Sequence, residues 1–318
     1  MKFYSTYKLL FGKGNNIIPL EIFFSIFFSI FFLTSCSKPY GHDKKEKKNQ
    51  SSEILISKEE KIWMNKFFHD FFLDSSAIYT LYGTKPLSSK EIIYATRKDW
   101  EHAVQPYLKS AEIEEKERAD AAIKQYCDDY DLHINWEKWV SFINNYPKSP
   151  FLFTKRQTKT KEIAFGYILN IQEMITTLLK NYDVFKKELG YDFDPISVTM
   201  DFKNIDSSFW NQVFSNHLLM GITYGYGLKN SYFFSMDMKK KIESKEIHSF
   251  FASIKEKEEQ EQPSLSHLLL PKFRSYRLSF NDDPILEKYK LERKKIQKEL
   301  NEKKFLQKTL NQLTGISN

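Results

Sequence analysis

The chain has 318 residues, of which 28% are charged, and its formal net charge is +7. A charge this small over this length disfavours nucleic-acid binding. Lysine and glutamate also alternate at helical spacing, as in "ESKEIHSFFASIKEKEEQE", which is typical of a solvated helix face.

An apolar run lies close to the N-terminus. Its charge-free part, Ile22 to Ser35, follows a basic start made by Lys2, Lys8 and Lys13. The run is too short to span a membrane comfortably, because a transmembrane helix needs about 20 apolar residues. It fits a secretory signal, whose apolar region has about 7–15 residues. We therefore expect residues 1–35 to be a signal peptide; an uncleaved anchor is the alternative.

The end of this run, Leu33-Thr34-Ser35-Cys36, resembles the cleavage box of bacterial lipoproteins. The resemblance implies that Cys36 is acylated, becomes the mature N-terminus and attaches the protein to a membrane. Ser37 as the second mature residue implies, by the same resemblance, the outer rather than the inner membrane. Cys127 is the only other cysteine, so no intramolecular disulfide remains and the fold must depend on its core.

Residues 36–56 contain almost no aliphatic side chain before Ile54 and are rich in lysine. Such a composition cannot bury enough surface to offset chain entropy, so we expect a disordered tether. Its lysines at 44, 45, 47 and 48 either attract anionic headgroups or keep the spacer soluble. Behind the tether we predict one mainly helical globular domain with a few short strands (α+β) over 57–282, and a long C-terminal helix over 283–318.

The first half of this body has clear local signals. Ser57 and Glu60 form a capping box that predicts a helix over 57–73. Then follow a predicted short strand over 77–82, a turn over 83–86, and a helix capped by Ser88 and Glu91. The pattern next predicts helices near 110–128 and 135–146, and strands at 149–157 and 162–169.

The second half begins with a predicted helix from Asn170 to Gly190. The remaining predicted elements are a strand at 195–202, a helix from 206 to 218, a helix at 230–255, a loop at 259–269 and a strand at 271–279. Asp283-Pro284 then opens the C-terminal helix, which we expect to run to about Leu313. Its apolar seam is imperfect, so we expect the start of the helix to pack on the body and its end to project into solvent. Pairing with a coiled-coil partner is the alternative.

Residues with catalytic potential are sparse. The seven histidines are scattered without metal-ligand spacing, so we expect no metal site and no cofactor. Asp192 and Asp194 in "GYDFDP", and Asp282 and Asp283 in "NDDP", are either paired carboxylates of a glycan hydrolase or a turn and a helix cap. Capping explains them fully and is favoured. No nucleophile-elbow, phosphate-loop or zinc-protease motif is present.

The stretch "HLLMGITYGYGLKNSYFF" concentrates three of the ten glycines of the chain. Gly225 and Gly227 are predicted to end one helix, and Asn230 to begin the next. Free amides at such a turn can bind an anion, although a tight interhelical corner packed with aromatics is the favoured interpretation. Gly225, Gly227 and Asn230, with Lys85 of the "YGTKP" turn, are the candidate ligand-binding residues.

Three segments resemble motifs of proteins without an assigned activity from chlamydia-like intracellular bacteria. They are "YTLYGTKPLS", "LLMGITYGYGLKNS" and "LLLPKF" followed by "LEKYKLERKKI". The resemblance covers roughly residues 60–297 and implies an envelope protein of a bacterium that lives inside host cells. It supplies no functional residues.

These observations favour a lipid-anchored, non-enzymatic envelope protein whose body binds a ligand or a protein partner. The membrane, reached through lipid on Cys36, is its first expected partner. One alternative is an envelope hydrolase that acts on a cell-wall or glycan substrate with residues distant in sequence. The other is a surface factor that contacts the host.

Overall fold

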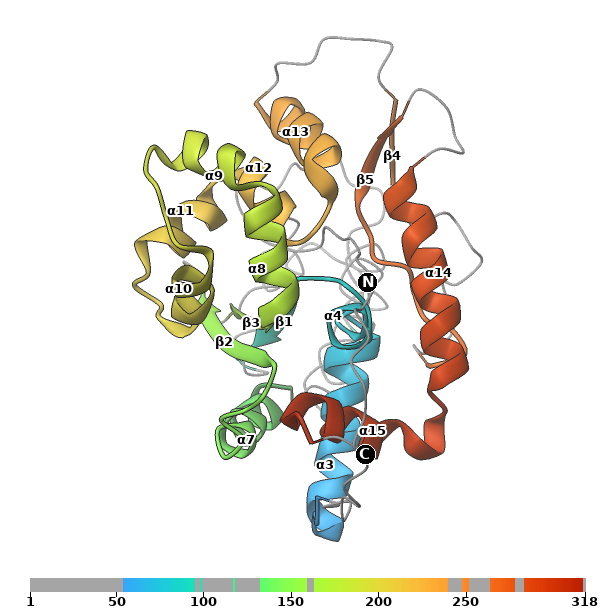
Figure 1. The fold of residues 1–318 in the computed structure, drawn as a ribbon. Helices are drawn as coiled ribbons and strands as arrows, with labels where there is room; N and C mark the ends of the chain where they lie inside the picture. The colour runs from blue at the N-terminus through green and yellow to red at the C-terminus, as the bar shows by residue number, and fades with distance from the viewer. Residues whose placement is uncertain are drawn as a thin grey trace, which may run out of the picture.

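The computed structural model describes residues 54–94, 98, 117, 132–158, 163–239, 248–251, 264–277 and 283–316. These residues form a mainly helical body with two small antiparallel sheets, which confirms the predicted fold class (Figure 1). The predicted signal peptide, Cys36 and nearly all of the tether lie outside the described residues. So does the helix predicted near 110–128, apart from Glu117.

The elements follow in chain order. The first helices are α3 (Lys58–Phe68), the π-helix η1 (His69–Leu73), α4 (Ile78–Tyr82) and α7 (Leu132–Ile143). The strands are β1 (Leu87–Ile93), β2 (Phe151–Gln157), β3 (Ile163–Asn170), β4 (His248–Phe251) and β5 (Arg274–Arg277). Between β3 and β4 lie α8 (Ile171–Lys180), α9 (Tyr182–Leu189), α10 (Pro195–Met200), the 3-10 helix η2 (Asp201–Lys203), α11 (Ser208–Ser215), α12 (His217–Thr223) and α13 (Gly227–Met238). The last helices are α14 (Pro284–Glu299) and α15 (Glu302–Thr314).

The larger sheet has the order β1-β3-β2, with β3 antiparallel to both neighbours. Gly166 in the middle of β3 pairs with Lys90 on one side and Lys155 on the other. The indole of Trp136 in α7 packs against this glycine, so a Cβ there would lie 2.6 Å from the Trp136 ring. The absence of a side chain at Gly166 therefore lets α7 lie close on the sheet.

An aromatic cluster joins α3 to α7 and the sheet. The Phe67 and Trp139 rings stack with centroids 5.7 Å apart, and Trp139 meets Phe153 of β2 edge-on at 5.5 Å. The π-helix η1 widens the end of α3 so that three consecutive residues, Phe71, Phe72 and Leu73, are all buried. The predicted capping box of α3 is confirmed, because the Glu60 amide donates to Ser57 Oγ and the Ser57 amide donates to Glu60 Oε2.

The strand predicted over 77–82 and the helix predicted after Ser88 are both wrong, because α4 is a helix and β1 is a strand. The potential cap at Ser88 was misleading. Its hydroxyl is buried and lies 2.7 Å from Thr80 Oγ1, so it holds α4 against β1 instead of starting a helix. Pairing with β3 decides the conformation of this segment, and that pairing depends on residues about 75 positions away.

The strand predicted at 195–202 is also wrong, since these residues form α10 and η2. Asp194 caps α10 by accepting a hydrogen bond from the Ser197 amide, and Pro195 occupies the first helical position. This bears out the capping interpretation of Asp194. In the helix predicted at 230–255, residues 248–251 are instead strand β4, which pairs with β5.

Three predicted helices are broken into two at asparagine or beside it. Asn181 separates α8 from α9, and Asn216 separates α11 from α12. The long C-terminal helix is a prediction that needs correction, because Leu300 is extended (φ −107°, ψ 143°) and Asn301 caps a new helix, α15. The end of the chain does not project either. Buried residues of α15 join the core, among them Phe305, Leu310 and Leu313.

Replacing Gly166 with alanine tests the contact between α7 and the sheet. The new Cβ would lie 2.6 Å from Trp136 and 2.7 Å from Ile92 Cδ1, so we expect a loss of about 1–3 kcal/mol in the free energy of unfolding from overpacking. Removing the Ile92 methyl with Ile92→Val should recover part of that loss in the double variant. Chemical denaturation of the two single variants and the double variant measures this coupling, and strictly additive losses would contradict it.

Candidate functional site

The predicted ligand-binding residues lie at two turns that meet inside the body. Lys85 lies in the turn between α4 and β1, while Gly225, Gly227 and Asn230 form the corner between α12 and α13. The Lys85 Nζ lies 5.9 Å from the centroid of the Tyr224 ring, next to this corner. Since both side chains are only 4% exposed, the two turns meet through packed side chains and not across an open cleft.

Lys85 is an unusual residue for a protein interior. Burial lowers the pKa of its amine from 10.5 to about 7, because the charged form loses its hydration. The ring that it faces is fixed by a hydrogen bond of 2.6 Å between Tyr224 Oη and Ser89 Oγ. Near neutral pH this amine therefore exists in both protonation states, which is a property of some catalytic lysines and also of buried structural ones.

The turn that carries Lys85 is bound to α14 by a buried carboxylate. Glu292 Oε1 accepts hydrogen bonds from the Thr84 amide at 3.3 Å and from Thr84 Oγ1 at 2.7 Å. Lys288 donates to Thr84 Oγ1 and lies 3.5 Å from Glu292, and the two side chains are each 12% exposed. The backbone of Gly83 leaves room for this carboxylate, because a Cβ there would lie 2.3 Å from Glu292 Oε2.

A second carboxyl group belongs to the same electrostatic cluster. Burial raises the pKa of Glu292, and burial also raises the pKa of Glu173 in the first turn of α8. The positive charge of Lys288 opposes both shifts, whereas the charge of Glu292 adds to the rise in the pKa of Glu173. Sequence reasoning missed this cluster, because Glu292 looks like any other charge in "KLERKKI".

The glycine corner has the backbone that its sequence predicts. Gly225 and Gly227 have φ of +80° and +74°, which only glycine adopts readily. A Cβ on Gly227 would also lie 2.8 Å from Ile285 Cδ1 of α14. Helix α13 begins at Gly227, so Asn230 lies in its first turn and not at its start.

Asn230 links three elements below this corner. Its side-chain Nδ2 donates a hydrogen bond to Asp283 Oδ2 at 3.2 Å, and its side-chain Oδ1 accepts one from the Tyr276 amide at 3.2 Å. Asp283 also accepts from Ser275 Oγ and caps α14 through the Ile285 amide. Asp283 of "NDDP" is therefore a helix cap, as the capping interpretation expected.

A small pocket of about 150 Å³ lies where the first turns of α13 and α14 approach β5. Gly227, Asn230 and Asp283 are among its lining residues. Typical ligand pockets are roughly 300–1,000 Å³, so this one is small for an organic ligand. The polar atoms of Asn230 and Asp283 already bind one another, which favours the structural interpretation of the corner.

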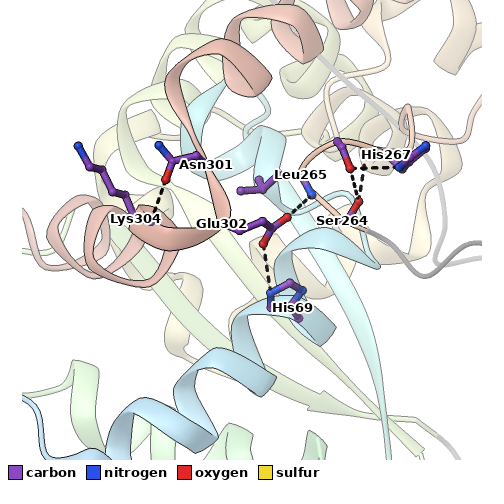
Figure 2. Close-up of polar contacts among 8 residues, drawn as sticks. His69, Ser264, Leu265, His267, Asn301, Glu302 and Lys304 are labelled. Carbon is purple, nitrogen blue, oxygen red and sulfur yellow. Dashed lines mark hydrogen bonds and ion pairs between the residues drawn. The ribbon is translucent and has the colours of Figure 1, made fainter.

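A third polar cluster lies on the surface between η1, α15 and the 264–267 turn (Figure 2). Glu302 Oε2 lies 3.8 Å from His69 Nε2, while Glu302 Oε1 accepts the Leu265 amide at 3.0 Å. The hydroxyl of Ser264 accepts the His267 amide at 3.2 Å within its own turn. These contacts attach the turn to two helices, and the His69 side chain is 41% exposed.

Within the described ranges, no group of three or more histidine, cysteine, aspartate or glutamate side chains is placed to hold a metal ion. In that same part of the chain, no helix combines the length and apolar character that a membrane span requires. Comparison with known proteins finds no matching family, no similar curated protein and no similar solved structure.

The buried amine of Lys85 predicts a specific dependence of stability on pH. Its pKa is 10.5 in a model lysine and about 7 in the folded chain, so between these values the unfolded chain binds more protons and stability rises with pH. The unfolding free energy of the wild type relative to Lys85→Met should therefore rise from pH 7 to 10, by about 1 kcal/mol per pH unit.

Denaturant titrations of both proteins at several pH values measure this difference. The control is Lys180→Met, which makes the same substitution at an exposed lysine at the end of α8. A Lys85→Met difference that stays constant from pH 7 to 10 contradicts the prediction.

Proposed function

We propose that this chain is a lipid-anchored bacterial envelope protein whose folded body binds a partner and has no catalytic activity of its own. The observation that carries the proposal is the apolar run that ends in Leu33-Thr34-Ser35-Cys36, followed by a polar, lysine-rich segment. The core begins shortly behind that segment, since Ile54 is already buried. Signal, acylation site, spacer and body thus follow one another in the order that a lipoprotein requires.

The contacts within the body support a binding role over a catalytic one. The carboxylates that are best suited to catalysis are instead used in structural contacts. These are Glu292 with Thr84, Asp283 with Asn230, and Glu302 with the Leu265 amide. Each of them joins segments distant in sequence, so substitution would remove a hydrogen bond that holds two parts of the fold together.

Acylation of Cys36 is tested by metabolic labelling with a radioactive fatty acid. Wild-type chain should carry the label and fractionate with membranes, because only the lipidated cysteine attaches it there. Cys36→Ser should lose the label, whereas Cys127→Ser, the matched control, should keep it. Label that persists in Cys36→Ser would refute lipid anchoring at this residue. Separation of the membranes on a density gradient then tests the expected outer-membrane location.

One observation favours glycan hydrolysis as the second candidate. Glu173 and Glu292 come from different helices, both have a raised pKa, and each is electrostatically coupled to Lys288. A glycosidase requires one carboxylic acid with a raised pKa near a second carboxylate. If this pair is catalytic, the protein releases reducing ends from cell-wall glycan and Glu173→Gln lowers the rate at least 100-fold. Release no greater than from heat-denatured protein eliminates this candidate.

A further inference from the structure

The outward face of α14 carries a row of positive charges beside an exposed apolar side chain. Lys294, Lys295 and Lys298 follow Leu291 at spacings of three, four and seven residues, so all four share one face of the helix. Leu291 is 66% exposed, and the three lysines are exposed as well. The opposite face packs in the core through Leu286, Tyr289 and Ile296.

The carboxylates of α14 do not cancel this charge. The helix has six basic and three acidic residues. Glu287 is paired with Lys290, whose Nζ lies 2.6 Å from its carboxylate, and Glu292 is turned inward to Thr84. Glu299 is exposed beside Lys298, so one carboxylate borders the stripe and the three lysines outnumber it. The field on the outward face is therefore positive around Leu291.

We propose that Leu291, Lys294, Lys295 and Lys298, here called the α14 stripe, dock the body on the anionic headgroups of a lipid bilayer. The lysines bind the negatively charged surface, and Leu291 enters the interface between them. This inference rests on the proposed lipid anchor. The attraction of three lysines is modest on its own, but the anchor keeps the body at a high local concentration beside the membrane, where it suffices.

The tether permits this orientation. An extended chain spans at most about 3.6 Å per residue, so the segment from Cys36 to Ile54 reaches about 60 Å. Any face of the body can then meet the bilayer, and the charge of each face decides which one does. The predicted lysine cluster of the tether adds charge of the same sign close to the lipid.

Charge also separates the α14 stripe from another exposed apolar surface. Ile196 and Met200 on α10 are 58% and 53% exposed and share one face of that helix. Four aspartates flank them in the sequence, at positions 192, 194, 201 and 206. Asp192 is paired with Lys186, and the other three still outnumber Lys203, so an anionic bilayer attracts this surface less than the α14 stripe. Helix α10 lies on the opposite side of the body from α14 in Figure 1, so it supplies a control position.

The test uses the acylated full chain, labelled at one cysteine with an environment-sensitive fluorophore. Leu291→Cys is made in a Cys127→Ser background, and the protein is mixed with vesicles of phosphatidylcholine alone or with 30% phosphatidylglycerol. We expect flotation with both vesicles. The emission should shift to the blue only when phosphatidylglycerol is present, and 0.5 M salt should reverse that shift. A fluorophore at Ile196→Cys should give no shift.

Charge reversal then identifies the residues responsible. The triple variant Lys294→Glu, Lys295→Glu, Lys298→Glu should still float but lose the blue shift. Its matched control reverses the same number of exposed lysines elsewhere, at Lys180, Lys187 and Lys203, and should keep the shift. Flotation with equal emission in both vesicles overturns the docking inference alone. Failure to float with either vesicle overturns the lipid anchor and the inference that rests on it.

Discussion

The hydrogen bonds between Glu292 and Thr84 are the constraint on which much of this structure depends. They join α14 to the turn between α4 and β1 across 208 positions of sequence. Because the turn is fixed in this way, Lys85 is enclosed beside Tyr224, and β1 enters the sheet at the register that buries Leu87. The same contact fixes one face of α14 inward and thereby determines which face is left for solvent or membrane.

The body has two kinds of interior, and they have different consequences. Around α3 and α7 it is almost purely aromatic, so stability there comes from apolar burial and ring packing. Around Lys85, Glu292 and Asp283 it contains charged groups, which burial penalises unless they are bonded. For the same buried volume, the second region therefore contributes less to the stability of the fold. We infer that these polar contacts make the packing between α4, α13 and α14 specific, since each hydrogen bond joins two different elements.

The proposed anchor and the proposed docking face act together at the membrane, the first by tethering the body and the second by orienting it. In this proposal, acylation at Cys36 holds the body within reach of a bilayer, and the α14 stripe turns one face towards it. In that proposed orientation α10 and α11, which lie on the other side of the body from α14 in Figure 1, face away from the membrane and leave Ile196 and Met200 exposed. The small pocket at the glycine corner has no part in this arrangement.

Local chemistry determined what the sequence predicted correctly. Ser57, Asn170 and Asp283 cap helices as expected, and positive φ falls at Gly190, Gly225 and Gly227, because caps and glycine turns depend only on nearby residues. The tertiary structure alone decided that 78–82 is a helix and 87–93 a strand, and that the C-terminal helix breaks at Leu300. Those outcomes depend on strand pairing and on the burial of Leu300 and Phe305. Both require contacts with residues that are distant in the sequence. It also alone brought Lys85 to Tyr224 and Glu292 to Thr84, since no spacing in a sequence encodes a contact between distant turns.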